Sequence, residues 1–161
     1  MKKTAILGFG NPVRSDDGIG CIVIEELKKR LGASPEGISL IDMGTSAFEV
    51  LFQLKGHERI IIVDAVMNTN EPDGTLYRLP ASAVEAAIQD DPMVFLHSLK
   101  WDQALSYAKK ILVHEYPDDI SVYLIAVSNT RLELEISDVV REAGTKVTDL
   151  ILTEIGVEVS I

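Results

Sequence analysis

The sequence is poor in several features that would point to familiar classes of protein. Only one of its 161 residues is a cysteine, which excludes an internal disulfide and suits a reducing compartment. Aromatic residues make up 6% of the chain, so we expect a mostly aliphatic core. Positive charge is scarce, and the net charge of −10 argues against binding to nucleic acid or to an anionic membrane surface.

Targeting signals and common metal motifs are also missing. No apolar run reaches the ~20 residues that a membrane helix needs, and no signal-peptide pattern precedes the first expected strand. There is no Cys-x-x-Cys pattern and no His-Glu-x-x-His helix. Cys21 lies in an apolar stretch, which favours a packed core thiol over a nucleophile. We therefore expect a cytoplasmic protein with one domain over residues 1–161.

The stretch Thr4–Gly20 is typical of a strand, a glycine turn and the start of a helix. Gly8 and Gly10 allow a sharp turn where a Cβ would clash. Asp16 and Asp17 then fall in the first turn of the helix, where carboxylates stabilise the helix dipole. A second interpretation is that one of the two points over the edge of the sheet, where a cation binds. Position alone leaves both interpretations open.

Two nucleotide-binding motifs can be compared with this glycine turn. The phosphate-binding Gly-x4-Gly-Lys-Ser/Thr string is absent. Gly8-Phe-Gly10 supplies the first half of a dinucleotide fingerprint, but Val13 occupies the third glycine position. The acidic pair that follows would repel a pyrophosphate. Asp42 ends the expected second strand, where a ribose-binding acid would lie, so nucleotide binding stays as an alternative.

Strands and helices alternate along the chain. Strands are expected over residues 4–7, 38–43, 59–66, 74–79 and 120–127. Helices are expected over residues 17–31, 46–54, 80–88, 98–112 and 135–155. Ser15 is the predicted cap of the first helix, and Phe48, Leu51 and Phe52 are expected to face inward from the second. This order predicts an α/β fold in which a twisted, mostly parallel sheet of about five strands has helices on both faces.

Three further residues are candidates for function. Asp64 directly follows the apolar run 60–63, and a carboxylate there is costly unless it is capped, paired or bound to a cation. Right-handed crossovers would put Asp64 and the glycine turn along one edge of the sheet. His97 precedes a helix and is either a structural cap or a ligand. Trp101, one turn later, either packs on the core or lines a partner's groove.

Four motifs, taken in order, carry a family resemblance. They are Gly8-x-Gly-Asn-Pro-x-x-x-Asp-Asp-Gly-x-Gly20, Asp42-x-Gly-Thr45, Ile-Ile-Val-Asp64-Ala and a single His97 before a helix. Over nearly its whole length the chain resembles the hydrogenase maturation endopeptidases, which process the large subunit of nickel–iron hydrogenases. The resemblance implies a three-layer sandwich of the phosphorylase/hydrolase-like kind. It also implies removal of a short C-terminal peptide from the large-subunit precursor after nickel insertion, in the cytoplasm.

The resemblance also assigns roles to particular residues. It implies that Asp17, Asp64 and His97 are the metal-contacting and catalytic residues of a metal-dependent or aspartyl-type endopeptidase whose cleavage activates the hydrogenase. Asp16 is left with a capping or supporting role. The implied metal is nickel carried by the precursor, with zinc or cadmium as substitutes in vitro. The partner is the precursor, no nucleic acid or membrane is expected, and a monomer suffices. A non-catalytic metal-binding module that assists assembly is the third alternative.

Overall fold

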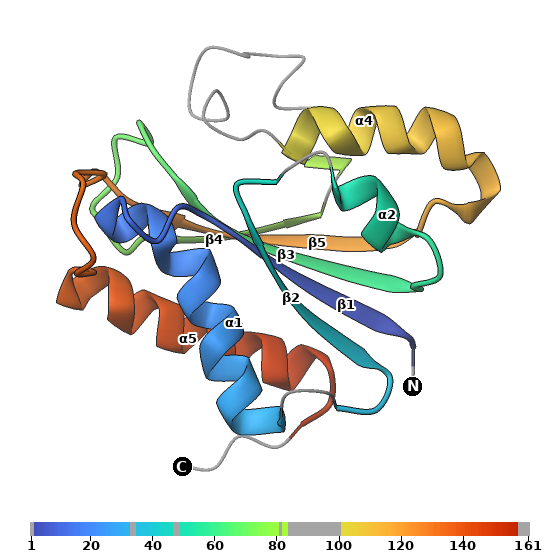
Figure 1. The fold of residues 1–161 in the computed structure, drawn as a ribbon, viewed down its shortest axis with the longest axis horizontal. Helices are drawn as coiled ribbons and strands as arrows, with labels where there is room; N and C mark the ends of the chain where they lie inside the picture. The colour runs from blue at the N-terminus through green and yellow to red at the C-terminus, as the bar shows by residue number, and fades with distance from the viewer. Residues whose placement is uncertain (1, 33–34, 47–48, 81, 84–100, 158–161) are drawn as a thin grey trace.

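A five-stranded sheet forms the centre of the protein (Figure 1). The computed structural model describes residues 2–32, 35–46, 49–80, 82–83 and 101–157. The strand order is β2-β1-β3-β5-β4. The strands are β1 (Thr4–Phe9), β2 (Ile38–Gly44), β3 (Arg59–Val66), β4 (Leu76–Pro80) and β5 (Asp119–Ala126). Only β4, at one edge, runs antiparallel to its neighbour, which confirms the predicted mostly parallel sheet.

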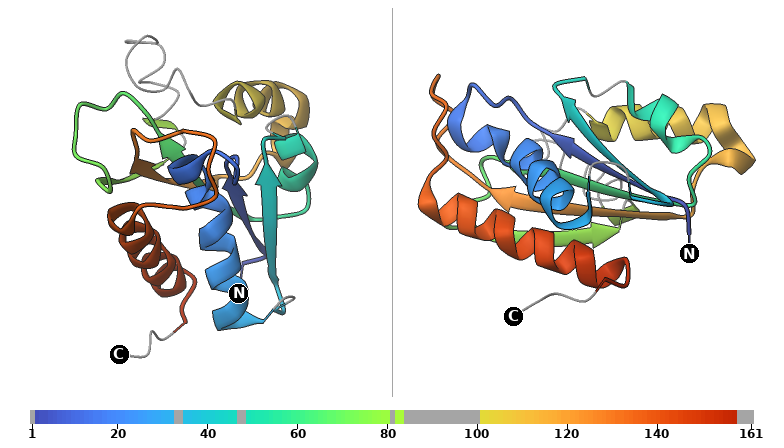
Figure 2. Two further views of the ribbon diagram at one scale, coloured as in Figure 1. Left: turned by 60° about the vertical axis from the view of Figure 1, so that its left-hand side comes forward. Right: turned by 60° about the horizontal axis from the view of Figure 1, so that its bottom comes forward.

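Helices cover both faces of this sheet, as predicted. The α-helices whose bounds the structure describes are α1 (Ile19–Leu31), α2 (Val50–Leu54), α4 (Trp101–Leu112) and α5 (Asp138–Glu154). The elements η1 (Ser15–Gly18) and η4 (Val113–Glu115) are 3-10 turns. Helices α1 and α5 lie side by side on one face, and α2 and α4 lie on the other (Figures 1 and 2). No helix among the described residues is long and apolar enough to cross a membrane.

The sheet divides the core into two halves, and the central strand β3 contributes side chains to both. Ile60 and Ile62 point toward α2 and α4, whereas Ile61 and Val63 point toward α1 and α5. Successive side chains of a strand face opposite sides of a sheet, so an unbroken apolar run is what a strand covered on both faces needs. Both halves are mainly aliphatic, as the composition predicts.

Two local predictions were wrong. Phe52, expected to face inward, is 76% exposed. Helix α2 has five residues and buries Val50 and Leu54, four positions apart, so Phe52 midway between them faces the opposite side. Ser15 does not cap the first helix. It belongs to η1, and its hydroxyl donates to the carbonyl oxygen of Glu135 at 2.6 Å.

Some predictions fall on residues outside those described. These are most of the helix expected over residues 80–88, the start of the helix expected over residues 98–112, and the side chains of Phe48 and Leu51.

Helix α5 begins at Asp138 rather than at the predicted residue 135, because Ser137 is its N-cap and has an extended backbone.

Helix α1 lies in direct backbone contact with the sheet. A Cβ added to Gly8 would lie 2.3 Å from the carbonyl oxygen of Gly20. A Cβ added to Gly20 would lie 2.1 Å from the carbonyl oxygen of Phe9 and 2.7 Å from that of Val63. Only glycine permits this approach. The contact determines where η1, which directly precedes α1, lies over the ends of the strands.

We expect Gly20→Ala to lower the free energy of unfolding by about 3 kcal/mol, because the new methyl group meets rigid backbone atoms rather than movable side chains. Gly56→Ala is the matched control, since Gly56 has a positive φ of 87° but open space around it. That variant should lose only about 1 kcal/mol, the cost of a left-handed alanine. Urea unfolding measures both. Equal losses would show that the contact between α1 and β1 is not tight.

Candidate functional site

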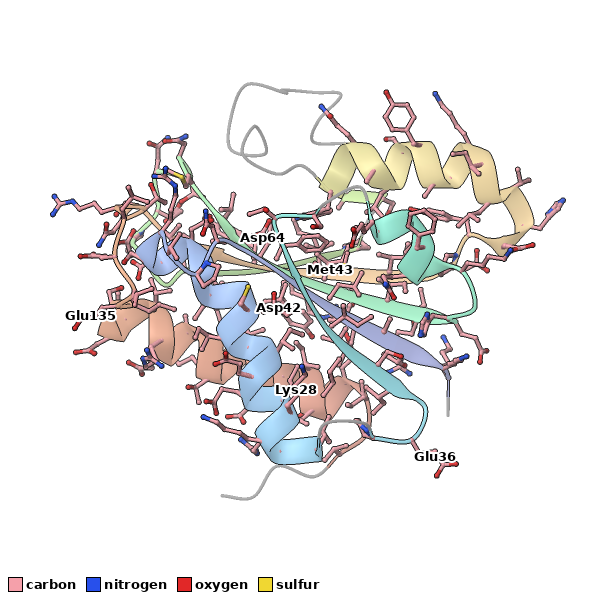
Figure 3. All side chains as sticks on the ribbon, viewed as in Figure 1. Lys28, Glu36, Asp42, Met43, Asp64 and Glu135 are labelled. Atoms are coloured by element: carbon pink, nitrogen blue, oxygen red, sulfur yellow. The ribbon has the colours of Figure 1, made fainter. Side chains whose placement is uncertain are left out.

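The carboxyl ends of the parallel strands bring several acidic residues to one edge of the sheet. The turn after β1 carries Asp16 and Asp17, β2 carries Asp42, and β3 carries Asp64. Figure 3 labels Asp42 and Asp64, whereas the labelled Glu36 lies at the opposite end of the molecule. In sheets of this type, ligands bind outside the carboxyl ends of the strands. This edge is therefore the candidate site.

Asp64 is a buried carboxylate with two hydrogen-bond donors. It is 9% exposed. Its Oδ2 accepts a hydrogen bond from Nε1 of Trp101 at 2.9 Å, and its Oδ1 accepts one from the backbone N–H of Ala65 at 2.8 Å. Burial raises the pKa of Asp64 well above its ordinary value, the two hydrogen bonds oppose that rise, and the charge of Asp17 adds to it. Asp17 and Asp64 are thus close enough to repel each other.

The 3-10 turn η1 presents Asp17 to this edge. Asp17 is half-buried, and its Oδ2 accepts a hydrogen bond from the backbone N–H of Asn11 at 3.0 Å. No hydrogen bond from a described residue occupies its Oδ1. The prediction that Asp64 and the glycine turn share one edge is confirmed, because β1 and β3 are parallel neighbours and η1 contacts β3.

Asp16 points the other way and is fully buried. Its two oxygens accept hydrogen bonds from the backbone N–H and the hydroxyl of Ser137, at 2.8 and 2.9 Å. Its own N–H donates to the carbonyl oxygen of Asn129 at 3.2 Å. Asp16 therefore ties η1 to the start of α5, which is the supporting role expected for it. Two adjacent aspartates perform different tasks.

A thiol–carboxylate pair lies beside these residues. The Cys21 thiol donates to Oδ1 of Asp42 at 3.1 Å. Burial raises the pKa of Cys21, and the hydrogen bond and negative charge of Asp42 raise it further. A thiol that holds its proton is a poor nucleophile, in agreement with the expected core thiol. Oδ1 of Asp42 also accepts a hydrogen bond from the N–H of Gly44 at 2.9 Å, so this oxygen bonds two groups of the protein itself.

The third residue named from the sequence, His97, lies outside the described residues. Within the described part of the chain, no group of three or more His, Cys, Asp and Glu side chains is arranged to hold a metal ion. The other two histidines lie elsewhere: Nδ1 of His57 is 2.7 Å from the carbonyl oxygen of Gln53 near the end of α2, and His114 is exposed in η4.

Sequence reasoning did not find the bond between Trp101 and Asp64. Trp101 is fully buried and packs near Phe9, with ring centroids 6.5 Å apart. The bond joins residues 37 positions apart, so no local spacing signals it. The only available signal was that a tryptophan buried in an aliphatic core needs a partner for its N–H.

The family model for hydrogenase maturation proteases, HycI, matches residues 21–154. The chain belongs to the hydrogenase maturation protease family. The matched residues include Asp64, whereas Asp17 lies just before them. This is a family of peptidases, and its members in the solved structures share the fold described above.

Three similar proteins illustrate the relationship. Hydrogenase 2 maturation protease of Escherichia coli K12 is 31% identical over 81 residues, which cover 50% of this chain and 49% of that protein. The match thus spans about half of that relative. Coenzyme F420 hydrogenase subunit delta of Methanothermobacter thermautotrophicus is 28% identical over 161 residues, with 94% of each chain covered. The crystal structure of hydrogenase 2 maturation peptidase from Thaumarchaeota archaeon SCGC_AB-539-E09 superposes with a TM-score of 0.72, at 26% identity, over 98% of this chain and 100% of that one.

The raised pKa of Asp64 predicts a pH-dependent stability. The folded state holds this proton more tightly than the unfolded state, whose carboxyl titrates near 3.8, so the metal-free protein loses stability as pH rises from about 4 through the raised pKa. In Asp64→Asn this loss is absent. The free energy of unfolding of the variant minus that of the wild type should therefore increase with pH, by up to about 1.4 kcal/mol per unit. Denaturant unfolding in chelator across pH 4 to 9 measures it, and a flat difference would contradict the shift.

The bonds of Asp16 predict a separate stability effect. Asp16→Ala leaves the N–H and hydroxyl of Ser137 without their buried acceptor, so we expect a loss of ~2–3 kcal/mol. Asp138→Ala is the control at the same helix start, where an exposed carboxylate only compensates the helix dipole, and it should cost about 0.5 kcal/mol. Chemical denaturation compares them, and similar losses would show that Asp16 does not hold η1 to α5.

Proposed function

We propose that this chain is an endopeptidase that removes a C-terminal peptide from the nickel-loaded large-subunit precursor of a nickel–iron hydrogenase. The observation that carries the proposal is the pair Asp17 and Asp64, which η1 and the end of β3 bring to the carboxyl edge of the sheet in a member of the hydrogenase maturation protease family. In this proposal the nickel arrives with the precursor as part of the substrate, and Asp17, Asp64 and His97 engage it.

The chemistry of the two carboxylates fits a cation. Asp17 and Asp64 repel each other when both are ionised, and a divalent ion between them would relieve that repulsion. Each oxygen of Asp64 accepts one hydrogen bond and keeps a further lone pair. The bonds from Trp101 and Ala65 also hold the carboxylate in one orientation, as supporting hydrogen bonds do for metal ligands.

His97 completes a set of ligands with mixed oxygen and nitrogen donors. Such a set suits nickel or zinc, and three protein ligands leave coordination positions for substrate or water. In the sequence, His97 precedes Trp101 by four residues, and Nε1 of Trp101 donates to Asp64.

The reaction is the hydrolysis of one peptide bond. Water adds to the scissile carbonyl carbon, the C–N bond breaks, and the leaving amine takes up a proton. By holding the nickel, Asp17, Asp64 and His97 would fix the position of the scissile bond relative to the enzyme. A metal held by these residues would supply Lewis-acid chemistry, either to the scissile carbonyl or to the attacking water.

Cleavage distinguishes this function from an assembly module that only binds metal. We expect His97→Ala to reduce the cleavage rate of a nickel-loaded precursor by roughly 100-fold or more, because one of the three ligands is lost. Asp17→Asn should behave in the same way. His114→Ala is the control for the loss of an imidazole, since His114 is exposed and lies in η4.

The measurement is the appearance of the shortened large subunit by mass spectrometry, with circular dichroism to confirm that each variant is folded. Normal cleavage by folded His97→Ala would remove the histidine from the site. Wild-type protein that binds the precursor without cutting it would instead support the assembly module.

A further inference from the structure

Two leucines in the loop between β5 and α5 are exposed to solvent beside the candidate site. Leu132 and Leu134 are 73% and 76% exposed, on either side of Glu133. The backbone of Glu133 is fixed, because its carbonyl oxygen accepts the N–H of Ser15 at 2.8 Å and its own N–H donates to the carbonyl oxygen of Arg131 at 2.9 Å. Both leucines therefore present apolar surface to solvent on a loop whose backbone is held in place.

The anchor of this loop is the turn that carries Asp17. Ser15, which bonds Glu133, is the first residue of η1, and its hydroxyl bonds the carbonyl oxygen of Glu135. Arg14 and Glu133 also form a parallel bridge. The loop after β5 and the turn after β1 lie side by side in Figures 1 and 2, and Glu135 is labelled in Figure 3. The loop that carries the leucines is therefore anchored to the turn that carries Asp17.

Two arginines lie in or against the same loop. Nη1 of Arg14 donates to the carbonyl oxygen of Thr130 at 3.4 Å, which places it next to Arg131. Neither arginine forms an ion pair with a described residue, although the chain has 25 acidic residues. A shallow hollow of about 470 Å³ is lined by Ser128, Asn129, Thr130 and Arg131. Guanidinium groups with free donors are the side chains best suited to bind a carboxylate.

We propose that Arg14 and residues 128–135, called here the docking loop, bind the C-terminal segment of the precursor, an inference that rests on the proposed function. Leu132 and Leu134 would contact apolar side chains of that segment. Arg14 and Arg131 would bind its terminal carboxylate, which the peptide to be removed carries by its covalent structure. Because η1 joins the docking loop to Asp17, a segment bound there enters the site directly.

Peptide binding tests this without any cleavage. The probe is a fluorescein-labelled peptide that copies the C-terminal extension of a large-subunit precursor from the source organism, made as the free acid and as the C-terminal amide. We expect fluorescence anisotropy to show that the wild type binds the amide roughly tenfold more weakly than the acid. Arg131→Ala should weaken binding of the acid to a similar degree and leave binding of the amide almost unaffected.

The apolar half of the surface has its own matched variants. Leu134→Ser should weaken binding of both peptides roughly tenfold, as expected when a buried leucine contact is lost. Phe52→Ser is the control, because Phe52 is also 76% exposed but lies on α2. Lys110→Ala, on α4, is the control for loss of a positive charge. With the precursor as substrate, Leu134→Ser should raise KM more than it lowers kcat.

Several outcomes would overturn the docking proposal. These are a wild-type protein that binds neither peptide, acid and amide that bind equally, or Leu134→Ser that binds like Phe52→Ser. The two proposals fail separately: wild-type protein that binds the acid in the expected pattern but leaves nickel-loaded precursor uncut would keep the docking loop and reject the endopeptidase.

Discussion

The backbone contact between α1 and the sheet is the constraint on which the candidate site depends. Gly8 and Gly20 let the helix lie directly on β1, with no side chain between them. This fixes the start of α1 over the carboxyl ends of the strands, and η1 is therefore held there as well. From that position Asp17 and Asp64 interact, although they belong to different strand–helix units. The glycines thus act on the site through packing, without contributing a side chain to it.

The candidate site contains one carboxylate whose burial costs free energy, and the structure around that carboxylate is rigid. Burial disfavours the charge of Asp64, and two hydrogen bonds only partly offset that cost. Asp16, the neighbour of Asp17, stabilises the position of η1 by accepting two hydrogen bonds from Ser137. Of the two aspartates in the turn, Asp16 is therefore structural and Asp17 remains available to a ligand. The same turn anchors the loop that carries Leu132 and Leu134. The proposed docking loop and the carboxylates of Asp16 and Asp17 are consequently held by the same turn.

The sequence predicted the sheet, its layers and the meeting of Asp64 with the glycine turn, because long apolar runs and alternating elements leave few arrangements of the chain. Prediction from the sequence failed where the contacts of a few residues determine the local structure. The inward face of α2 was misjudged because a five-residue helix shows too few turns to define a face. Ser15 has the composition of a cap, but a long-range bond to Glu135 determines its role. The partner of Asp64 was missed because Trp101 is remote in sequence.

The bond between Trp101 and Asp64 has an optical consequence. The chain contains a single tryptophan, so all of its indole emission comes from the group that donates to the carboxylate at the centre of the candidate site. Indole fluorescence responds to the charge and hydrogen bonding around the ring nitrogen. The unlabelled protein therefore carries its own spectroscopic probe of that carboxylate. Any cation or substrate group that engages Asp64 can be followed in real time by the emission wavelength and intensity of Trp101.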